Sequence, residues 1–136
     1  MRYLIDTNVI SELRKRQNAN KNLLHWFEQV SEQQLFLSVL TIGEIRNGIE
    51  RIRRRDAESA EHLDAWLQQV EDTMAGNILP ITRTIANHWG TLGIPNRLSV
   101  IDSLLAATAL VHDLTLVIRN TRDVETTGVK LLNPFE

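Results

Sequence analysis

Short apolar runs alternate with longer amphipathic segments along the chain. The runs at residues 2–5, 35–39, 78–81, 114–118 and 129–132 have the length and composition of buried strands. Between them, apolar residues recur at helical spacing, at residues 9–13, 23–30, 41–52, 56–75 and 84–92. Strands that alternate with helices in this way predict an α/β fold, in which helices cover both faces of a parallel β-sheet.

One predicted helix, from Ser99 to Val111, is apolar nearly all round, which is typical of a helix buried inside a domain. Asp102 nevertheless stands in its first turn. A carboxylate in such surroundings is protonated, paired with a cation or bound to a metal. The Ser99-to-Asp102 spacing also fits a capping box, in which both side chains serve only to start the helix. The residues alone leave these two interpretations open.

Three more acids follow predicted strands. Asp6 comes after the first strand, Glu44 lies three residues beyond Thr41 in another capping-box spacing after the second, and Asp123 follows the strand at 114–118. Each also has a structural interpretation as a helix cap or turn residue. Because parallel strands end at one edge of a sheet, we expect all four acids to converge there.

Four carboxylates that converge repel one another unless they share a cation. Hard divalent ions with oxygen ligands suit such a cluster, and Mg²⁺ or Mn²⁺ is the expected occupant. The neighbouring helix N-termini favour a phosphate. This combination indicates phosphoryl transfer to a metal-activated water.

Composition indicates the number of domains, the kinds of metal site that are excluded and the cellular compartment. The 136 residues suffice for one domain, over residues 1–136, with a substantial core. The absence of cysteine excludes disulfides and thiolate metal sites and suits a reducing cytosol. Met1 runs directly into an apolar strand, so we expect no leader, no membrane segment and a cytoplasmic protein. The four histidines lack the spacing of a zinc site: His25, His62, His88 and His112.

Charge is distributed unevenly around a net value of −2. Residues 1–55 hold ten basic and six acidic side chains, whereas residues 56–136 hold five and eleven. The positive charge gathers in two clusters, which are either solvated helix faces or contacts for an RNA backbone. These clusters are Arg14, Lys15 and Arg16, and Arg51, Arg53, Arg54 and Arg55.

The acids and their surroundings resemble those of the PIN-domain ribonucleases, and most closely the VapC-type toxins of bacterial toxin–antitoxin pairs. The matching segments occur in the family's order over essentially the whole chain. They are Tyr3-Leu4-Ile5-Asp6-Thr7-Asn8 with Ser11-Glu12-Leu13, Ser38-Val39, Thr41-Ile42-Gly43-Glu44-Ile45, Gly48-Ile49, Asp102 with Leu104 and Ala106-Ala107-Thr108-Ala109, Leu114-Thr115-Leu116-Val117, Arg119-Asn120-Thr121-Arg122-Asp123, Gly128-Val129 and Asn133-Pro134-Phe135.

The resemblance implies one PIN-like domain and an endoribonuclease that depends on Mg²⁺ or Mn²⁺. It assigns the metal-binding and catalytic positions to Asp6, Glu44, Asp102 and Asp123, with Asn8 and Thr121 as polar neighbours. It further implies a homodimer that cuts transfer RNA or another structured RNA. A cognate antitoxin would hold the enzyme inactive by covering the acidic groove with its tail, while its other end binds operator DNA.

Two other functions compete with this one. The Asp6-Thr7-Asn8 triplet invites comparison with aspartyl-phosphate hydrolases, in which the first aspartate of an Asp-x-Asp motif is the nucleophile, but Asn8 stands here in place of the second acid. A non-catalytic module that binds RNA or protein could use the same fold. In that case the acids would only cap helices.

Overall fold

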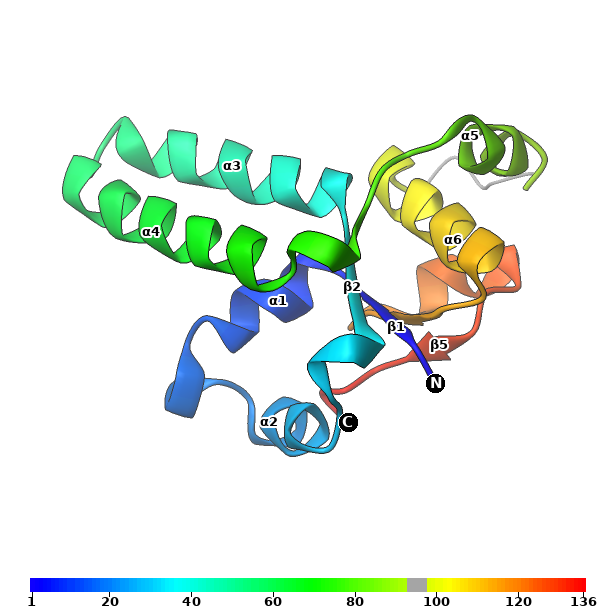
Figure 1. Cartoon of the computed structure of the whole chain (residues 1–136), viewed down its shortest axis with the longest axis horizontal. Coiled ribbons are helices and arrows are strands. Elements are labelled where there is room, and N and C mark those ends of the chain that lie inside the picture. Colours follow the sequence, from blue (N-terminus) through cyan, green and yellow to red (C-terminus); the bar gives the residue numbers. More distant parts are fainter. Residues whose placement is uncertain (93–97) are drawn as a thin grey trace.

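The computed structural model describes residues 1–92 and 98–136, and the strands in this part of the chain form one parallel sheet (Figure 1). The strands are β1 (Tyr3–Ile5), β2 (Leu35–Ser38), β3 (Ile78–Leu79), β4 (Thr115–Val117) and β5 (Leu131–Leu132). Their spatial order is β3-β2-β1-β4-β5, and each neighbouring pair is parallel. The chain extends the sheet in one direction from β1 to β3 and then adds β4 and β5 on the other side of β1. Ligand sites in open α/β sheets form where the order reverses in this way, here at the carboxyl ends of β1 and β4.

Side chains alternate between the two faces of the sheet, as the period of a strand requires. The register places Leu4 beside Leu116 and Ile5 beside Val117. Leu4 and Leu116 are buried in the core cluster that contains Leu105 of the last helix. Ile5 and Val117 belong to a second cluster, built with the first two helices. Both faces are therefore covered, and the predicted α/β architecture is confirmed.

The helices are α1 (Thr7–Leu13), α2 (Lys21–Glu28), α3 (Val39–Arg53), α4 (Ala57–Thr73), α5 (Arg83–Gly90) and α6 (Val100–His112). Short 3-10 turns lie at Arg16–Asn18 (η1), Glu32–Gln34 (η2), Ala75–Asn77 (η3) and Arg122–Thr127 (η4). Figure 1 shows α3 and α4 side by side as an antiparallel pair, and α5 packs against α6. None of the helices described is long and apolar enough to cross a membrane. The sequence Gly93-Ile94-Pro95 also predicts a helix break, and these residues lie outside the described part of the chain.

The start of α3 differs from the sequence-based prediction. The capping box expected between Thr41 and Glu44 is wrong, because α3 begins at Val39 and the Ser38 hydroxyl accepts a hydrogen bond from the Leu40 N–H (3.0 Å). Thr41 is instead fully buried, and its hydroxyl lacks a hydrogen-bond partner within the described residues. Glu44 is consequently in the second turn of α3. Glu44 therefore does not cap the helix, which Ser38 caps instead.

Candidate active site

Asp6 lies at the carboxyl end of β1, where its backbone and side chain are both fixed. Its N–H donates to the carbonyl of Val117 on β4 (3.0 Å), which joins the two central strands at this edge. Its side chain caps α1 by accepting a hydrogen bond from the Asn8 N–H (3.2 Å). The predicted capping role is therefore real. It does not account for the burial of Asp6, which is only 4% exposed.

The surroundings of Asp6 disfavour its negative charge. Burial, with the charges of Asp102 and more weakly Glu44, raises the pKa of Asp6 to about 6, although hydrogen bonds from the Asn8 and Thr7 N–H groups oppose this shift. The carboxylates of Asp102 and Glu44 thus lie close enough to Asp6 to act on its titration. Acids separated by 38 and 96 positions in the sequence share one electrostatic environment.

Asp102 interacts electrostatically with each of the other three acids. The Ser99 hydroxyl accepts the Asp102 N–H (3.0 Å), so the predicted helix start is confirmed, and the Asp102 carboxylate is half-buried. Burial raises its pKa, a hydrogen bond with the Ser99 side chain opposes the rise, and the charges of Glu44 and Asp123 add to it. Asp102 is therefore the acid on which the charges of Glu44 and Asp123 both act.

Glu44 is held by a residue that sequence reasoning did not single out. The Thr7 hydroxyl donates a hydrogen bond to Glu44 Oε1 (2.5 Å), which ties the first turn of α1 to α3. Thr7 is adjacent to Asp6 in a run of helix-capping residue types. That position was the only indication in the sequence, because its partner lies 37 residues away.

Asp123 acts on the pKa of Asp102 and is absent from the groups that shift the pKa of Asp6. It lies in η4 and accepts a hydrogen bond from the Asn120 side chain (2.8 Å). Thr121 precedes η4 and is half-buried, while the Asn8 side chain is exposed. Of these two predicted polar neighbours, Asn8 touches the acids directly, through its backbone N–H.

The acids have the donor chemistry of a divalent-cation site without its compact geometry. In residues 1–92 and 98–136, every charged group that shifts the pKa of Asp6 or Asp102 is another carboxylate. An all-carboxylate set suits a hard cation such as Mg²⁺ or Mn²⁺. As the side chains stand, however, no three acids or histidines in that part of the chain converge closely enough to hold an ion. Binding would require the carboxylates to draw together.

The basic residues predicted from the sequence separate into different environments. Arg14, Lys15 and Arg16 are exposed after α1. Arg53 instead donates to Asp64 of α4 (2.7 Å), as does Arg46 (2.6 Å), so it connects α3 to α4. The neighbouring arginines of the same cluster are exposed near the turn between these helices: Arg51, Arg54 and Arg55.

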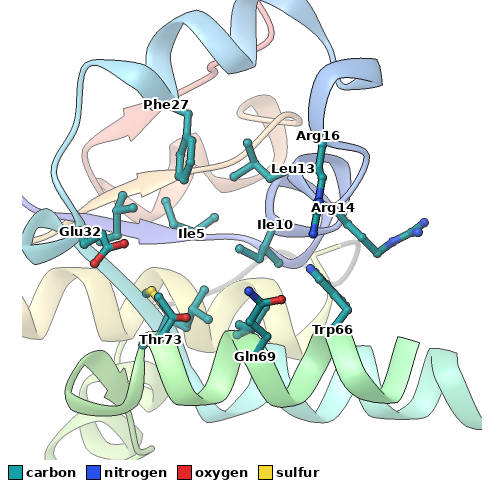
Figure 2. Close-up of a pocket in the computed structure, with 14 residues that line it drawn as sticks. Ile5, Ile10, Leu13, Arg14, Arg16, Phe27, Glu32, Trp66, Gln69 and Thr73 are labelled. Atoms are coloured by element: carbon teal, nitrogen blue, oxygen red, sulfur yellow. The ribbon is translucent and has the colours of Figure 1, made fainter. Parts of the chain in front are cut away.

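An apolar groove of about 250 Å³ lies between α1, α2 and α4. Figure 2 shows Phe27 and Leu13 on one side of it and Trp66, Gln69 and Thr73 of α4 on the other. Arg14 and Arg16 stand at one end. Phe27, which lines this groove, is 39% exposed. The groove is separate from the acids, none of which lines it.

Comparison with known families and proteins gives concordant results. The model of the family described as "PIN domain" matches residues 3–128 of this chain. The plasmid stability protein StbB of Pseudomonas syringae pv. tomato is 30% identical over 98% of both chains. The VapC ribonuclease Y4jK of Sinorhizobium fredii is 30% identical over 98% of this chain and 97% of its own.

Solved structures show the same similarity in three dimensions. FitAcB from Neisseria gonorrhoeae superposes with a TM-score of 0.88 at 28% identity, covering 98% of this chain and 99% of that one. FitAB bound to an IR36 DNA fragment superposes with a TM-score of 0.87 at 27% identity, covering 98% of this chain and 96% of that one. A toxin–antitoxin complex from Klebsiella pneumoniae gives 0.71 at 25% identity, with 98% of both chains covered.

Proposed function

The chain belongs to the PIN-domain family, and from this premise we propose that it is a divalent-metal-dependent endoribonuclease that acts as the toxin of a toxin–antitoxin pair. One observation carries the proposal. Asp6 is buried at the edge where the strand order reverses, and the charged groups within the described residues that act on its titration are both carboxylates, Asp102 and Glu44. Such an arrangement is destabilising in an isolated protein and becomes favourable when a cation neutralises it.

In this proposal Asp6, Glu44 and Asp102 hold the ion, and Asp123 adds negative charge beside Asp102. When bound, Mg²⁺ or Mn²⁺ supplies a water nucleophile and neutralises charge on an RNA phosphodiester. Thr7 fixes the position of Glu44, and the Asn8 N–H fixes that of Asp6. Their contribution is orientation, which typically changes metal affinity or activity by about 10- to 100-fold.

The proposed substrate is transfer RNA or another structured RNA, encountered in the cytoplasm. Exposed basic side chains next to α1 and at the α3–α4 turn supply contacts to its backbone. They are Arg14, Lys15, Arg16, Arg51, Arg54 and Arg55; Arg53 is held by Asp64 and contributes to the same field.

The proposed partners are a cognate antitoxin, whose other end binds operator DNA, and a second copy of the chain. The similarity to FitAB and to the Klebsiella toxin–antitoxin complex supports the antitoxin, and the DNA fragment in one FitAB structure supports the operator. We place an apolar segment of the antitoxin in the groove between α2 and α4, because that groove leaves Phe27 exposed. Its tail would continue to the acids and neutralise them.

Cleavage of transfer RNA by the purified chain tests this function. We expect cleavage with Mg²⁺ or Mn²⁺, none with EDTA, and a loss of at least about 100-fold in Asp102→Asn. Asp113→Asn is the matched control, since it makes the same chemical change at the other end of α6. Asp113 there adopts φ 54°, a conformation that asparagine also tolerates.

Each alternative has its own outcome. Cleavage that survives both EDTA and Asp102→Asn contradicts the proposal. RNA binding without cleavage under any metal condition supports the non-catalytic module instead. Phosphate trapped covalently on Asp6 supports an aspartyl-phosphate hydrolase.

A further inference from the structure

A second, polar pocket lies beside Asp6, and the function proposed above uses two of its residues, Arg14 and Lys15, only as contacts to the RNA backbone. Its volume is about 340 Å³. The residues that line it come from α1, from the loops after α1 and β4, and from the C-terminal segment, and they include Asn8, Ser11, Arg14, Lys15, Arg119 and Phe135. Three of these are cations and one is aromatic. This combination differs from both the acidic edge and the apolar groove.

The pocket adjoins the acids through the two central strands. Asn8 lines the pocket while its backbone N–H donates to Asp6 Oδ2 (3.2 Å). Arg119 lies two residues beyond Val117, whose carbonyl accepts the Asp6 N–H (3.0 Å). A ligand that fills the pocket is therefore next to Asp6, on the α1 side of the acids.

Arg119 is positioned by one contact to its guanidinium and one to its backbone. Its guanidinium carbon lies 4.6 Å from the centre of the Phe135 ring, a cation–π contact. Asn133 holds both residues, because its side chain donates to the Arg119 carbonyl (2.9 Å) and accepts the Phe135 N–H (2.9 Å). The Asn22 side chain of α2 also donates to the Phe135 carbonyl (2.9 Å). An arginine held this way loses little freedom on binding an anion.

The pocket remains positive at neutral pH. Its one carboxylate, Glu12, pairs with Lys15 (2.9 Å) and accepts the Asn20 N–H (2.9 Å). The Lys15 hydrogen bond, followed by that from Asn20, holds the pKa of Glu12 below its usual value, so Glu12 is ionised and its charge is already paired. Within the described residues Arg14 and Arg119 form no ion pair, and the Lys15 ammonium has three donors, so it can hold a phosphate while it pairs with Glu12.

We propose that this pocket binds the nucleotide next to the cut in a single-stranded segment of the RNA substrate. Arg119 and Lys15 hold its phosphate, and its base stacks against the Arg119 guanidinium, which itself lies over the Phe135 ring. Asn8 and Ser11 offer the amide and hydroxyl groups that ribose and base edges recognise. Stacking on arginine or aromatic planes and phosphate contacts are the usual means of binding unpaired RNA. This proposal rests on the endoribonuclease function above.

Binding of a short fluorescein-labelled single-stranded RNA, measured in EDTA over a range of salt concentrations, tests the pocket without cleavage. Arg119→Gln is expected to weaken binding about tenfold and to reduce the salt slope by about one. Phe135→Leu is expected to weaken binding at an unchanged slope, because it removes stacking and no charge. Lys15→Gln, at an exposed position that does not endanger folding, should repeat the change in slope. Arg83→Gln, an exposed arginine on α5, is the control.

The proposal is overturned if the RNA affinity and its salt slope stay at wild-type values in Arg119→Gln, Lys15→Gln and Phe135→Leu. Loss of antitoxin affinity at unchanged RNA affinity overturns it as well, since the pocket would then receive a protein segment. Mn²⁺ affinity, measured by calorimetry, is expected to stay unchanged in all three variants. Weakened RNA binding together with a wild-type chain that cuts no RNA would support the pocket and contradict the endoribonuclease, so the two failures are distinguishable.

Discussion

The Thr7 hydroxyl donates a hydrogen bond to Glu44 Oε1 and so connects the first turn of α1 to the second turn of α3. The residue before Thr7 is Asp6, and the charge of Glu44 raises the pKa of Asp6. The hydrogen bond therefore holds two carboxylates near each other although their charges repel. This relationship supports the proposal that a cation occupies the site, because like charges held together repel unless a cation neutralises them.

We expect Thr7→Val to lower metal-dependent cleavage by about 10-fold or more, the usual effect of losing a residue that orients a metal ligand. Thr7→Ser keeps the hydroxyl and should retain most activity. Cleavage rates and Mn²⁺ affinity by calorimetry measure the effect. Equal rates in the valine and serine variants would show that the hydrogen bond to Glu44 has no role in cleavage.

The raised pKa of Asp6 predicts a pH-dependent stability in the absence of metal. This pKa is about 6 in the folded protein, against 3.8 for an aspartate in ordinary surroundings, which represents the unfolded chain. Between these values the folded state keeps a proton that the unfolded state has released, so stability falls as pH rises from about 4 to about 6 and remains lower above that. Two pKa units correspond to about 3 kcal/mol.

Asp6→Asn should abolish this dependence and make the EDTA-treated protein more stable than wild type above about pH 6, the pKa of the folded state. Asparagine also caps helices well, so the start of α1 is preserved. Urea unfolding at about pH 4 and about pH 8 measures the difference, and saturating Mn²⁺ should reverse the order by stabilising only the wild type. If wild type and Asp6→Asn differ in stability by the same amount at both pH values, the Asp6 carboxyl is not the source of the pH dependence.

The two arginines at the end of the α3–α4 pair should respond differently to substitution. Arg53→Gln removes ion pairs with Glu50 and Asp64 and should lower the melting temperature. Arg54→Gln at the adjacent exposed position should leave the melting temperature unchanged, and combined with Arg55→Gln it should reduce the salt slope of RNA binding by about one per charge. An unchanged slope would identify this cluster as a solvated helix face.

Local pattern was sufficient for the architecture and for the candidate acids. Alternating strands and helices predicted the parallel sheet, and an acid inside the buried α6 helix indicated an unusual environment, which the raised pKa of Asp102 reflects. The start of α3 was misplaced because Ser38 ends β2 and caps α3 at once, so no loop separates the two. The Thr41-to-Glu44 spacing then imitated a helix start inside a helix.

Relationships between distant residues could not be predicted from local pattern. The Thr7–Glu44 hydrogen bond and the Arg119–Phe135 contact each join segments whose approach depends on the whole sheet. Arg53 shows the same limit. Its sequence context is a run of arginines, and only the packing of α4 reveals that Asp64 already pairs with it. Side chains that act in pairs across the fold are therefore where structure adds most to the sequence.

The groove between α2 and α4 predicts how antitoxin inhibition can be weakened without touching the acids. Phe27→Ser removes an apolar side chain that is 39% exposed, and burial of this exposed part by a bound helix or strand contributes about 1 kcal/mol, out of about 1.5–3 kcal/mol for complete burial. We therefore expect the cognate antitoxin to inhibit this variant only at concentrations about 5-fold higher, since about 1.4 kcal/mol corresponds to a tenfold change in affinity. Uninhibited cleavage should be unaffected, because the acids do not line the groove. Glu28→Ser, at the next position of α2 and outside the groove, is the matched control. Inhibition that is equally strong in both variants would place the antitoxin elsewhere on the toxin surface.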